Sequence, residues 1–370
     1  KGQTVCVKGS ALYDTFDRDL CVNVYSIAPA EKEKEITDNS PVKRVELHAH
    51  TKMSSMDGVC STSDLVKLAI RYGHKAVAIT DHGVVQAFPE AMNTKENAKS
   101  DIKIIYGVEA YLTDSVQDVV NGESYHCIVL VQNQTGLKNL YKLISMSHLD
   151  YFYKHPKMPR EVLQKYREGL ILGSACEAGE LYQAILAKKS PEEIRKIVDF
   201  YDYLEIQPNG NNMFMVRNGL LHSVQDIEDI NRYIVSLAKE AGKPVVATCD
   251  VHFLREKDSV FRKLLMAGQG YSDAEFQAPL YFRTTYEMLD EFSYLGKEKA
   301  HEVVIENTNK IADMCDFVRP IKEGTYAPEI EGSAEELHRL VEDKVLELYG
   351  ENPPSEVRNR VDVEMDSIIK

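Results

Sequence analysis

The chain has 370 residues, of which 44% are hydrophobic and 28% are charged, and its formal net charge is −14. This composition is typical of a soluble globular protein, and the length is enough for one large α/β domain with smaller pieces or for two domains. No apolar stretch approaches the ~20 residues of a membrane helix, which excludes a membrane-spanning class. The acidic balance makes the chain a poor non-specific binder of nucleic acid by itself, because phosphate contacts need surplus lysine and arginine.

Seven cysteines are scattered along the chain without a CxxC pair or a disulfide framework. That usage is typical of a reducing compartment. The first residues, KGQTVCVKGS, lack the apolar core of a signal peptide, so we expect a cytoplasmic protein.

The N-terminal residues 1–28 alternate apolar and polar side chains, as in LYDTFDRDLCVNVYSI. This pattern predicts a β-hairpin that belongs to another small domain. Residues 29–41 are charged and contain proline, so we expect a linker there.

From Val42 onward, short apolar runs alternate with helical patterns. The helical pattern of STSDLVKLAIRYG (61–73) begins with capping residues and ends at a glycine, and SVQDIEDINRYIVSLAKEAG (223–242) behaves likewise. About seven strands that alternate with helices imply mostly parallel pairing with right-handed crossovers. A doubly wound sheet and a closed barrel both satisfy this pattern. The apolar runs are VKRVELH, HKAVAIT, DIKIIYG, YHCIVLV, EGLILGS, DYLEIQP and KPVVATC.

Beyond about Arg283 the strand patterns stop and helical patterns follow, as in KEKAHEVVIENTNKIADMC and SAEELHRLVEDKVLELYG. We therefore expect a main α/β domain over 42–285 and a helical extension over 286–370.

Side chains capable of binding a metal recur at the ends of the apolar runs. Most lie at or just beyond the C-terminal end of a run, which in a barrel of parallel strands is the face that carries the active site; His126 instead lies near the start of its run. Residues i and i+2 of an extended chain point the same way, so HAH (48–50) and DVH (250–252) each direct two ligand groups to one side. The same alternation turns Cys127 and Cys249 away. The candidates are His48, His50, Asp57, Asp81, His82, Glu109, His126, Cys176, Asp250 and His252.

Imidazole, carboxylate and thiolate groups are ligands of zinc, manganese and iron. These groups outnumber the ligands of one tetrahedral ion, so we expect two or three divalent cations, zinc or manganese, with Glu109 as the bridging carboxylate. A close cluster of cations clamps a phosphoryl group and generates hydroxide near neutral pH. The predicted chemistry is phosphoester hydrolysis, with catalytic roles for Glu109, Asp57 and Asp81, the last of which orients a ligand rather than binding metal.

Each motif alone also has an ordinary explanation. Asp and Gly after a strand, as in TDHG, are common turn residues, and a lone cysteine such as Cys176 is more often a small buried hydrophobe. Together they favour a metal centre, because chance rarely places all of them on one face. Arg255 and Lys257, just after DVHFL, are expected to contact phosphate or DNA.

Six segments in order along the chain resemble the motifs of the polymerase and histidinol phosphatase (PHP) domain family. The resemblance covers about residues 41–285 and is greatest to the PHP domain of PolC-type DNA polymerases III, the replicative polymerases of low-GC Gram-positive bacteria. The segments are ELHAHTKMSSMDG, AITDHG, YGVEAYL, YHCIVLVQNQTGLKNLYKLIS, GLILGSACEAGEL and ATCDVHFL.

This resemblance implies a distorted (β/α)7 barrel that holds up to three metals. It assigns metal binding to His48, His50, Asp57, His82, Glu109, His126, Cys176, Asp250 and His252. It also implies that residues 1–28 end an oligonucleotide-binding (OB) domain and that residues 286–370 lead into a polymerase palm. The implied partners are primer–template DNA, the palm, OB and exonuclease domains of the same enzyme, and a sliding clamp bound through regions outside this chain, with magnesium for the full polymerase.

The chain departs from the family in two respects. A proofreading exonuclease interrupts the PHP domain of PolC-type enzymes after the GVEAYL region, whereas here only TDSVQDVVNGES (113–124) separates that region from His126. No palm segment with paired aspartates is present, so we expect no DNA polymerisation by this chain alone.

Three other functions are compatible with parts of this pattern. A non-catalytic scaffold would use the same metals to stabilise the barrel. A free-standing phosphatase similar to histidinol phosphatase is disfavoured by the flanking segments. A metal-dependent amidohydrolase also begins with HxH at a strand end, but the DVH ending and the lack of a lysine at a matching strand end argue against it.

Overall fold

The computed structural model describes residues 3–16, 18–30, 36–326, 328 and 330–369. Its internal contacts divide the chain into two compact units, Lys1–Ile321 and Lys322–Lys370, and each is described by itself. Among the described residues, none of the helices combines the length and the apolar character that crossing a membrane requires.

The N-terminal segment is an antiparallel hairpin of β1 (Val5–Asp14) and β2 (Asp19–Pro29), so the predicted hairpin is confirmed. Its side chains are exposed on both faces, and its assignment to an OB domain stays a prediction. Residues 31–35 of the predicted linker lie outside the described residues. The end of that linker is not a free connection, because Asp38 and Ser40 are buried and Asp38 accepts hydrogen bonds from Thr285.

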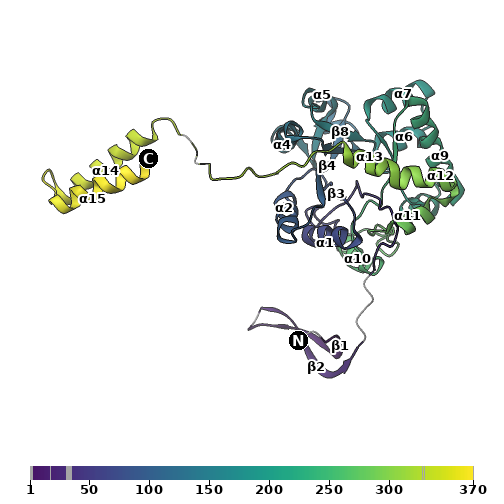
Figure 1. Ribbon diagram of the computed structural model, residues 1–370, viewed down its shortest axis with the longest axis horizontal. Helices are drawn as coiled ribbons and strands as arrows, with labels where there is room; N and C mark the ends of the chain where they lie inside the picture. The colour runs from purple at the N-terminus through teal and green to yellow at the C-terminus, as the bar shows by residue number, and fades with distance from the viewer. Residues whose placement is uncertain (1–2, 17, 31–35, 327, 329, 370) are drawn as a thin grey trace. The chain divides into compact units, whose positions relative to one another are not determined.

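Seven extended segments within residues 36–321, all in the described part of the chain, form a closed ring surrounded by helices (Figure 1). Around the ring they run in the order 45–50, β3, β4, β5, β8, β9 and β10. The ring closes where Ala49 bridges Val251 and where Gly173 bridges Tyr203. The predicted (β/α)7 barrel is therefore present. Its named strands are β3 (Ala76–Ile79), β4 (Lys103–Thr113), β5 (Tyr125–Val131), β8 (Leu170–Gly173), β9 (Leu204–Ile206) and β10 (Val245–Ala247). Two short strands lie outside the ring: β7 (His155–Pro159) pairs with the end of β4, and β6 (Phe152–Tyr153) pairs with β7.

One strand of the ring runs opposite to the others. β5 pairs antiparallel with both β4 and β8. The mostly parallel pairing that we expected did not single out this strand as reversed. The reversal is possible because only a short connection with a four-residue helix, α3 (Asp118–Asn121), joins β4 to β5, too little for a parallel crossover. It explains why His126 lies at the start of its run: the start of β5 lies at the same end of the ring as the ends of its neighbours.

The first segment of the ring contains a bulge between Glu46 and Ala49. The amide of Ala78 donates to the Glu46 carbonyl and the amide of Thr80 donates to the Ala49 carbonyl, so one extra residue lies on the first segment. The Glu46 carboxylate accepts from the amides of Leu47 and His48. The bulge lets the apolar Val45 and Leu47 face the inside of the barrel and still turns His48 and His50 toward the polar end.

Apolar side chains fill the inside of the ring below that polar end. They include Ile105, Ile128, Leu130, Ile171 and Val246, and a buried Tyr203 packs where Gly173 leaves room, since a Cβ at Gly173 would lie 2.2 Å from the Tyr203 ring. The outward side chains of the strands pack against the surrounding helices. Those helices are α1 (Thr62–Tyr72), α2 (Phe88–Asn97), α4 (Gln134–Leu149), α5 (Arg160–Lys165), α6 (Glu180–Leu186), α7 (Pro191–Phe200), α8 (Met213–Arg217) and α9 (Val224–Ala241), with 3-10 turns at Asn209–Asn212, Glu256–Asp258 and Ser293–Leu295 and helix α10 at Ser259–Gly268.

The predicted helices 61–73 and 223–242 are confirmed. Helix α1 begins after Ser61, whose side chain accepts from the Asp64 amide, and ends at Gly73 in the left-handed conformation. Helix α9 begins after Ser223, whose amide donates to the Asp226 carboxylate, and it ends at Gly242 in the left-handed conformation.

The helices between residues 285 and 313 belong to the barrel, contrary to the boundary expected at 285/286. They are α11 (Thr285–Glu291), α12 (Lys297–His301), a π-helical turn (Glu302–Glu306) and α13 (Asn307–Asp313). Ile311 and Cys315 join the apolar cluster inside the ring, and Thr308 accepts from the Val45 amide. Apolar residues at helical spacing show that a helix is amphipathic but not which core it covers. The second unit contains α14 (Ser333–Tyr349) and α15 (Ser355–Ile369), whose relation to a palm stays a prediction.

Candidate metal centre

The structure brings all nine predicted ligand residues to one end of the ring. They come from separate elements: the bulged first segment and the loop after it, the ends of β3, β8 and β10, the middle of β4 and the start of β5. Because these elements are fixed by the barrel, side chains far apart in the sequence meet in one pocket.

Glu109 lies at the centre of this group. Its Oε1 lies 2.9 Å from His126 Nδ1 and 3.3 Å from His48 Nε2. Its Oε2 lies 2.9 Å from His82 Nδ1 and 3.3 Å from His50 Nε2. Burial alone would raise the pKa of Glu109, but the imidazoles of His126, His48 and His82 outweigh it and hold the pKa well below its usual range. The carboxyl group is therefore ionised, and each of its two oxygens faces two imidazoles, as a bridging ligand requires.

Two aspartates complete the group on the other side of the imidazoles. Asp57 Oδ2 lies 3.2 Å from His82 Nε2 and 3.1 Å from His252 Nε2. Asp250 Oδ1 lies 3.3 Å from His48 Nε2 and 3.4 Å from His50 Nε2. Asp250 has a φ of 56°, a left-handed conformation that is uncommon outside glycine and that concentrates at functional sites.

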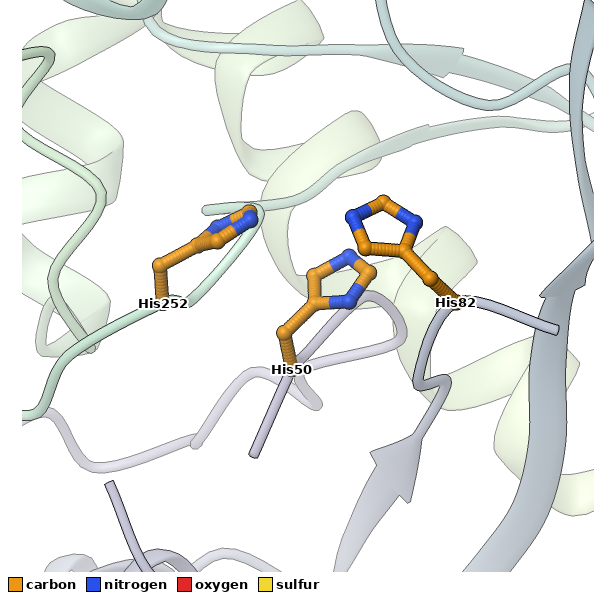
Figure 2. Close-up of side chains that lie close together, drawn as sticks. All are labelled: His50, His82 and His252. Carbon is orange, nitrogen blue, oxygen red and sulfur yellow. The ribbon is translucent and has the colours of Figure 1, made fainter. Parts of the chain in front are cut away.

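Three imidazoles from three different loops face one another across the pocket, those of His50, His82 and His252 (Figure 2). In this group the ligand atoms all lie within 4.8 Å of one another, and the same holds for His48, His50 and Glu109 and for His82, Glu109 and His126. Neighbouring groups share His50, His82 or Glu109. This overlap is the arrangement expected of adjacent cations with common ligands.

Two buried polar atoms in the pocket test whether these residues fit a metal. Asp250 Oδ1 and His82 Nδ1 form no hydrogen bond, although imidazole or carboxylate atoms lie within 3.5 Å of each. A buried polar atom without a hydrogen-bond partner destabilises the folded state. A cation between such atoms would provide the missing partner, because ligand atoms converge on a cation without forming hydrogen bonds to one another. The donor set of imidazole and carboxylate groups suits zinc or manganese.

The pKa values of two imidazoles are raised by the negative charge of the carboxylates in the pocket. Burial alone would lower the pKa of His48 and of His82. The carboxylates of Asp250, Glu205 and Glu109 raise the pKa of His48 well above its usual value, and those of Glu109 and Asp57 raise the pKa of His82 to about 10. For His252, burial outweighs the neighbouring carboxylates and lowers the pKa. An imidazole must be neutral to ligate a cation, so metal binding here displaces protons.

The outer nitrogens of the HAH histidines are held by residues behind the pocket. His48 Nδ1 lies 2.7 Å from Glu205 Oε1. His50 Nδ1 lies 2.9 Å from Ser54 Oγ, which donates to Asp81 Oδ1 at 2.7 Å. These contacts leave Nε2 of both rings directed into the pocket, in the manner of carboxylate-oriented metal ligands. Asp81 thus lies behind the predicted ligands, and its role in orienting a ligand stays a prediction.

Glu205 and Ser54 were not among the predicted site residues. The signal for Glu205 was present in the sequence, since it is the one charged residue within the apolar run YLEI of β9. Ser54 lies in a polar loop, where nothing in the sequence distinguishes it from an ordinary turn residue.

Cys176 lies at the edge of the group. Its Sγ is 3.6 Å from Glu109 Oε1 and 3.5 Å from His126 Nδ1, and the preceding Ala175 is held at a φ of 58°. Burial, reinforced by the charges of Glu177 and Glu109, raises the pKa of the Cys176 thiol well above its usual value. The thiol therefore ionises only if a cation is bound beside it.

The pocket opens into a hollow of about 210 Å³ that is lined by Asp57, Glu109, His126, Asp250 and residues of the segment after β10. Two arginines, Arg217 and Arg262, also line it. Arg255 and Lys257, expected to contact phosphate, instead line a different hollow beside Asp64 and Arg71, and Arg255 pairs with Asp258. The predicted contacts were the basic residues nearest to DVHFL, and Arg262, further along on α10, was not among them.

The pattern of residues has counterparts in known proteins. Residues 46–209 match the family model of the PHP domain. Over its whole length the chain is 35% identical to the PolC-type DNA polymerase III of Clostridium perfringens and 33% identical to that of Caldanaerobacter subterraneus subsp. tengcongensis. Residues 46–209 are thus similar to the PHP domain, and the whole chain is similar to a part of PolC-type DNA polymerases III.

Relative to these PolC-type polymerases the chain is partial, since it spans 39% and 40% of their lengths. The alignment with the Clostridium perfringens polymerase runs over 566 positions, whereas the chain has 370 residues. That relative therefore carries long segments without a counterpart here. The position of the omitted exonuclease near 113–124 stays a prediction. Among solved structures, a two-domain protein from Bacteroides vulgatus, described as containing a predicted PHP-like metal-dependent phosphoesterase, is similar with a TM-score of 0.32 and 12% identity over 60% of this chain and 57% of that chain.

Proposed function

We propose that the PHP pocket of this chain binds two or three divalent cations, zinc or manganese, and hydrolyses a phosphoester at a nucleic-acid terminus or the phosphoanhydride of pyrophosphate. The observation that carries the proposal is Glu109, a buried ionised carboxylate with two imidazoles around each oxygen. Such an arrangement is unfavourable for folding unless cations occupy the space between these groups.

The residues that would hold the cations are His48, His50, Asp57, His82, Glu109, His126, Cys176, Asp250 and His252. When bound, the cations supply a hydroxide near neutral pH and stabilise charge on the phosphoryl group. Before a cation binds, the facing imidazoles hold the pKa values of Glu109, Asp57 and Asp250 below the usual range, so these carboxylates are already ionised when a cation arrives. Glu205 and the Ser54–Asp81 pair fix the tautomers of His48 and His50 so that both Nε2 atoms remain available.

A 3′-labelled oligonucleotide incubated with the 370-residue chain and Mn²⁺ or Zn²⁺ tests this function. We expect release of the labelled nucleotide, loss of that release in His126→Ala, and full release in His301→Ala, which removes an exposed imidazole on α12. Absence of release by the wild-type chain, with metal verified as bound, would eliminate the enzymatic function.

A non-catalytic scaffold is the second candidate, and a specific observation favours it. His48 and His50 are fully buried and continue directly into the barrel wall, so cations at their Nε2 atoms would stabilise the fold itself. A ligand present at ~100 times its dissociation constant stabilises the folded state by about 2.7 kcal/mol. In that case chelation lowers the melting temperature of the chain strongly while no hydrolysis accompanies metal binding.

The function of the whole polymerase is proposed from the family alone. We propose that this region works beside palm, OB and exonuclease domains on primer–template DNA in the cytoplasm, with magnesium at the palm and a sliding clamp bound elsewhere in the enzyme. The catalytic roles of Asp57 and Asp81 are part of the same proposal, Asp57 as a ligand and Asp81 as the residue that orients Ser54.

A further inference from the structure

The segment 254–279 leaves the barrel beside the metal centre and returns to the same point. Phe253 bridges Tyr281, and the amide of His252 donates to the Leu280 carbonyl at 2.8 Å. The two ends of the segment are therefore tied together next to His252, and the residues between them form a cover over the hollow. We call residues 254–279 the cover segment.

The cover segment is held loosely on its outer side. None of the described residues of α10 is buried, and Val260, Phe261 and Leu264 are 47%, 57% and 65% exposed. The inward side of α10 instead presents Arg262 and Met266 to the hollow. Few buried apolar contacts mean that such a segment opens at a low free-energy cost, so its polar contacts with the barrel decide where it rests.

Arg262 makes the contact that joins the cover segment to the metal centre. Its Nε and Nη2 both donate to Asp57 Oδ1, at 2.9 Å and 2.5 Å, and its Nη1 donates to Gln277 Oε1 at 3.2 Å. The other oxygen of the same carboxylate, Asp57 Oδ2, faces His82 and His252. Asp57 can therefore hold Arg262 through one oxygen and a cation through the other.

The charges that line the hollow show what Arg262 is suited to bind. Five carboxylates line it, against the two guanidinium groups of Arg217 and Arg262; the carboxylates are those of Asp57, Glu109, Glu177, Asp250 and Asp273. An anion can approach these carboxylates only where cations and guanidinium groups offset them. Guanidinium groups match the oxygens of phosphate in a two-pronged geometry, and Arg217 is already positioned over the Phe276 ring at 5.3 Å.

We infer that Arg262 is a substrate-binding residue that holds the phosphate of the substrate at the metal centre. This inference rests on the proposed phosphoesterase site and names the residue that recognises its substrate. Arg262 keeps Asp57 Oδ1 through Nε and Nη2, and its Nη1 exchanges the Gln277 oxygen for a non-bridging phosphate oxygen. The cover segment carries Arg262, so phosphate binding also fastens this segment over the hollow, which Arg217 and Phe276 line as well.

Equilibrium binding of inorganic phosphate and of thymidine monophosphate to the Mn²⁺-loaded chain tests this inference without requiring turnover. We expect Arg262→Gln to bind both about 10–100-fold more weakly, the loss that follows removal of a hydrogen bond to a charged group. Arg262→Lys should recover part of that affinity. The matched control is Lys263→Gln, which removes a cation from the next position of α10, where Lys263 pairs with Glu275 inside the cover segment, and it should bind phosphate as the wild type does.

Two further measurements separate this role from a structural one. Mn²⁺ affinity of Arg262→Gln should stay within a few-fold of wild type, because Asp57 keeps its ligand oxygen. Phosphate should slow trypsin cleavage within the cover segment in the wild type and in Lys263→Gln but not in Arg262→Gln. Phosphate affinity in Arg262→Gln equal to that of wild type would overturn the inference, and so would a wild-type chain that holds Mn²⁺ and binds no phosphate. Arg262-dependent phosphate binding without any hydrolysis would support the inference and refute the proposed catalysis.

Discussion

The inside of the barrel contains two layers of side chains with opposite chemistry, although the same strands supply both. On β4, Ile105 lies in the apolar layer and Glu109, four residues later on the same face, lies among the imidazoles. Along β10 and the residues after it, Val246 and Asp250 repeat this change. The apolar layer stabilises the fold by burial, whereas the ligand layer contains ionised carboxylates that burial disfavours.

The apolar layer positions the side chains above it, and the ligand layer carries the groups that we propose bind cations. A cluster of ionised and unpaired groups cannot hold itself together in the absence of cations. The packed apolar layer of the same strands holds these groups in place. Substitutions in the two layers should therefore have separable effects on cation affinity and on stability, and four predictions follow this division.

The largest effect on binding is expected from Glu109→Gln in the ligand layer. Glu109 contributes to two of the three close groups of ligand atoms, so Mn²⁺ affinity should fall by more than the ~10–100-fold that loss of an outer partner of a ligand costs. Isothermal titration calorimetry measures this, with the exposed Glu240→Gln as the control. Unchanged Mn²⁺ stoichiometry and affinity in Glu109→Gln would show that the carboxylate does not bridge cations.

The largest effect on stability is expected from Ile128→Ala in the apolar layer. Ile128 is fully buried and pairs with Glu109 across β4 and β5, so the free energy of unfolding should fall by about 2–5 kcal/mol. Urea denaturation of the metal-free chain measures it. Val120→Ala, at a position that is 53% exposed, should change the free energy by no more than about 0.5 kcal/mol. Equal losses in the two variants would contradict the division into layers.

A smaller effect on Mn²⁺ affinity is expected from Glu205→Gln. Glu205 lies between the two layers. Glu205 accepts from Thr248 and Gln207 and faces His48 Nδ1, so its loss should weaken Mn²⁺ binding by about 10–100-fold through the orientation of His48. Competition with a fluorescent chelator measures the affinity. Affinity unchanged in Glu205→Gln would mean that His48 needs no support from behind or does not ligate.

The smallest effect concerns Asp38, which lies far from the ligands. Burial alone would raise its pKa, but hydrogen bonds from His74 and Thr285 outweigh burial and hold the pKa well below the usual range. A depressed carboxyl pKa contributes stability that is complete above about pH 4 and is lost as the pH falls below that value. Asp38→Asn should therefore lower the free energy of unfolding by about 1–3 kcal/mol at pH 7.

The difference between wild type and Asp38→Asn should shrink by about 1 kcal/mol between pH 7 and pH 3. Urea denaturation at both pH values checks it. A difference that stays constant or grows toward pH 3 would show that Asp38 is not held ionised by His74 and Thr285.

Local patterns restricted the fold to a doubly wound sheet or a barrel, and the family resemblance implied the barrel. The same patterns marked the residues that meet at its polar end. Alternation along a strand fixed the direction of His48 and His50, and it correctly turned Cys127 and Cys249 into the outer core. It could not predict the reversal of β5, since strand direction depends on which neighbours a strand finds and not on its own residues. The same limit applies to α13, because Ile311 and Cys315 have the spacing of any amphipathic helix.

The residues that surround the ligands were harder to predict than the ligands themselves. Ligands are marked by rare residue types at strand ends, whereas Ser54 and Arg262 are ordinary residues in a loop and on an exposed helix. Ser54 becomes relevant because the bulge at 46–49 directs His50 toward it. Arg262 becomes relevant because the cover segment returns to Leu280 and so brings Arg262 beside Asp57.

Anomalous diffraction at the manganese edge from crystals of this chain soaked in Mn²⁺ tests the central claim most directly. Two or three strong anomalous peaks should lie among His50, His82, Glu109 and Asp250, with at least one peak within bonding distance of Glu109. Crystals that show Mn²⁺ only at surface carboxylates, with an empty density map between these four side chains, would contradict it.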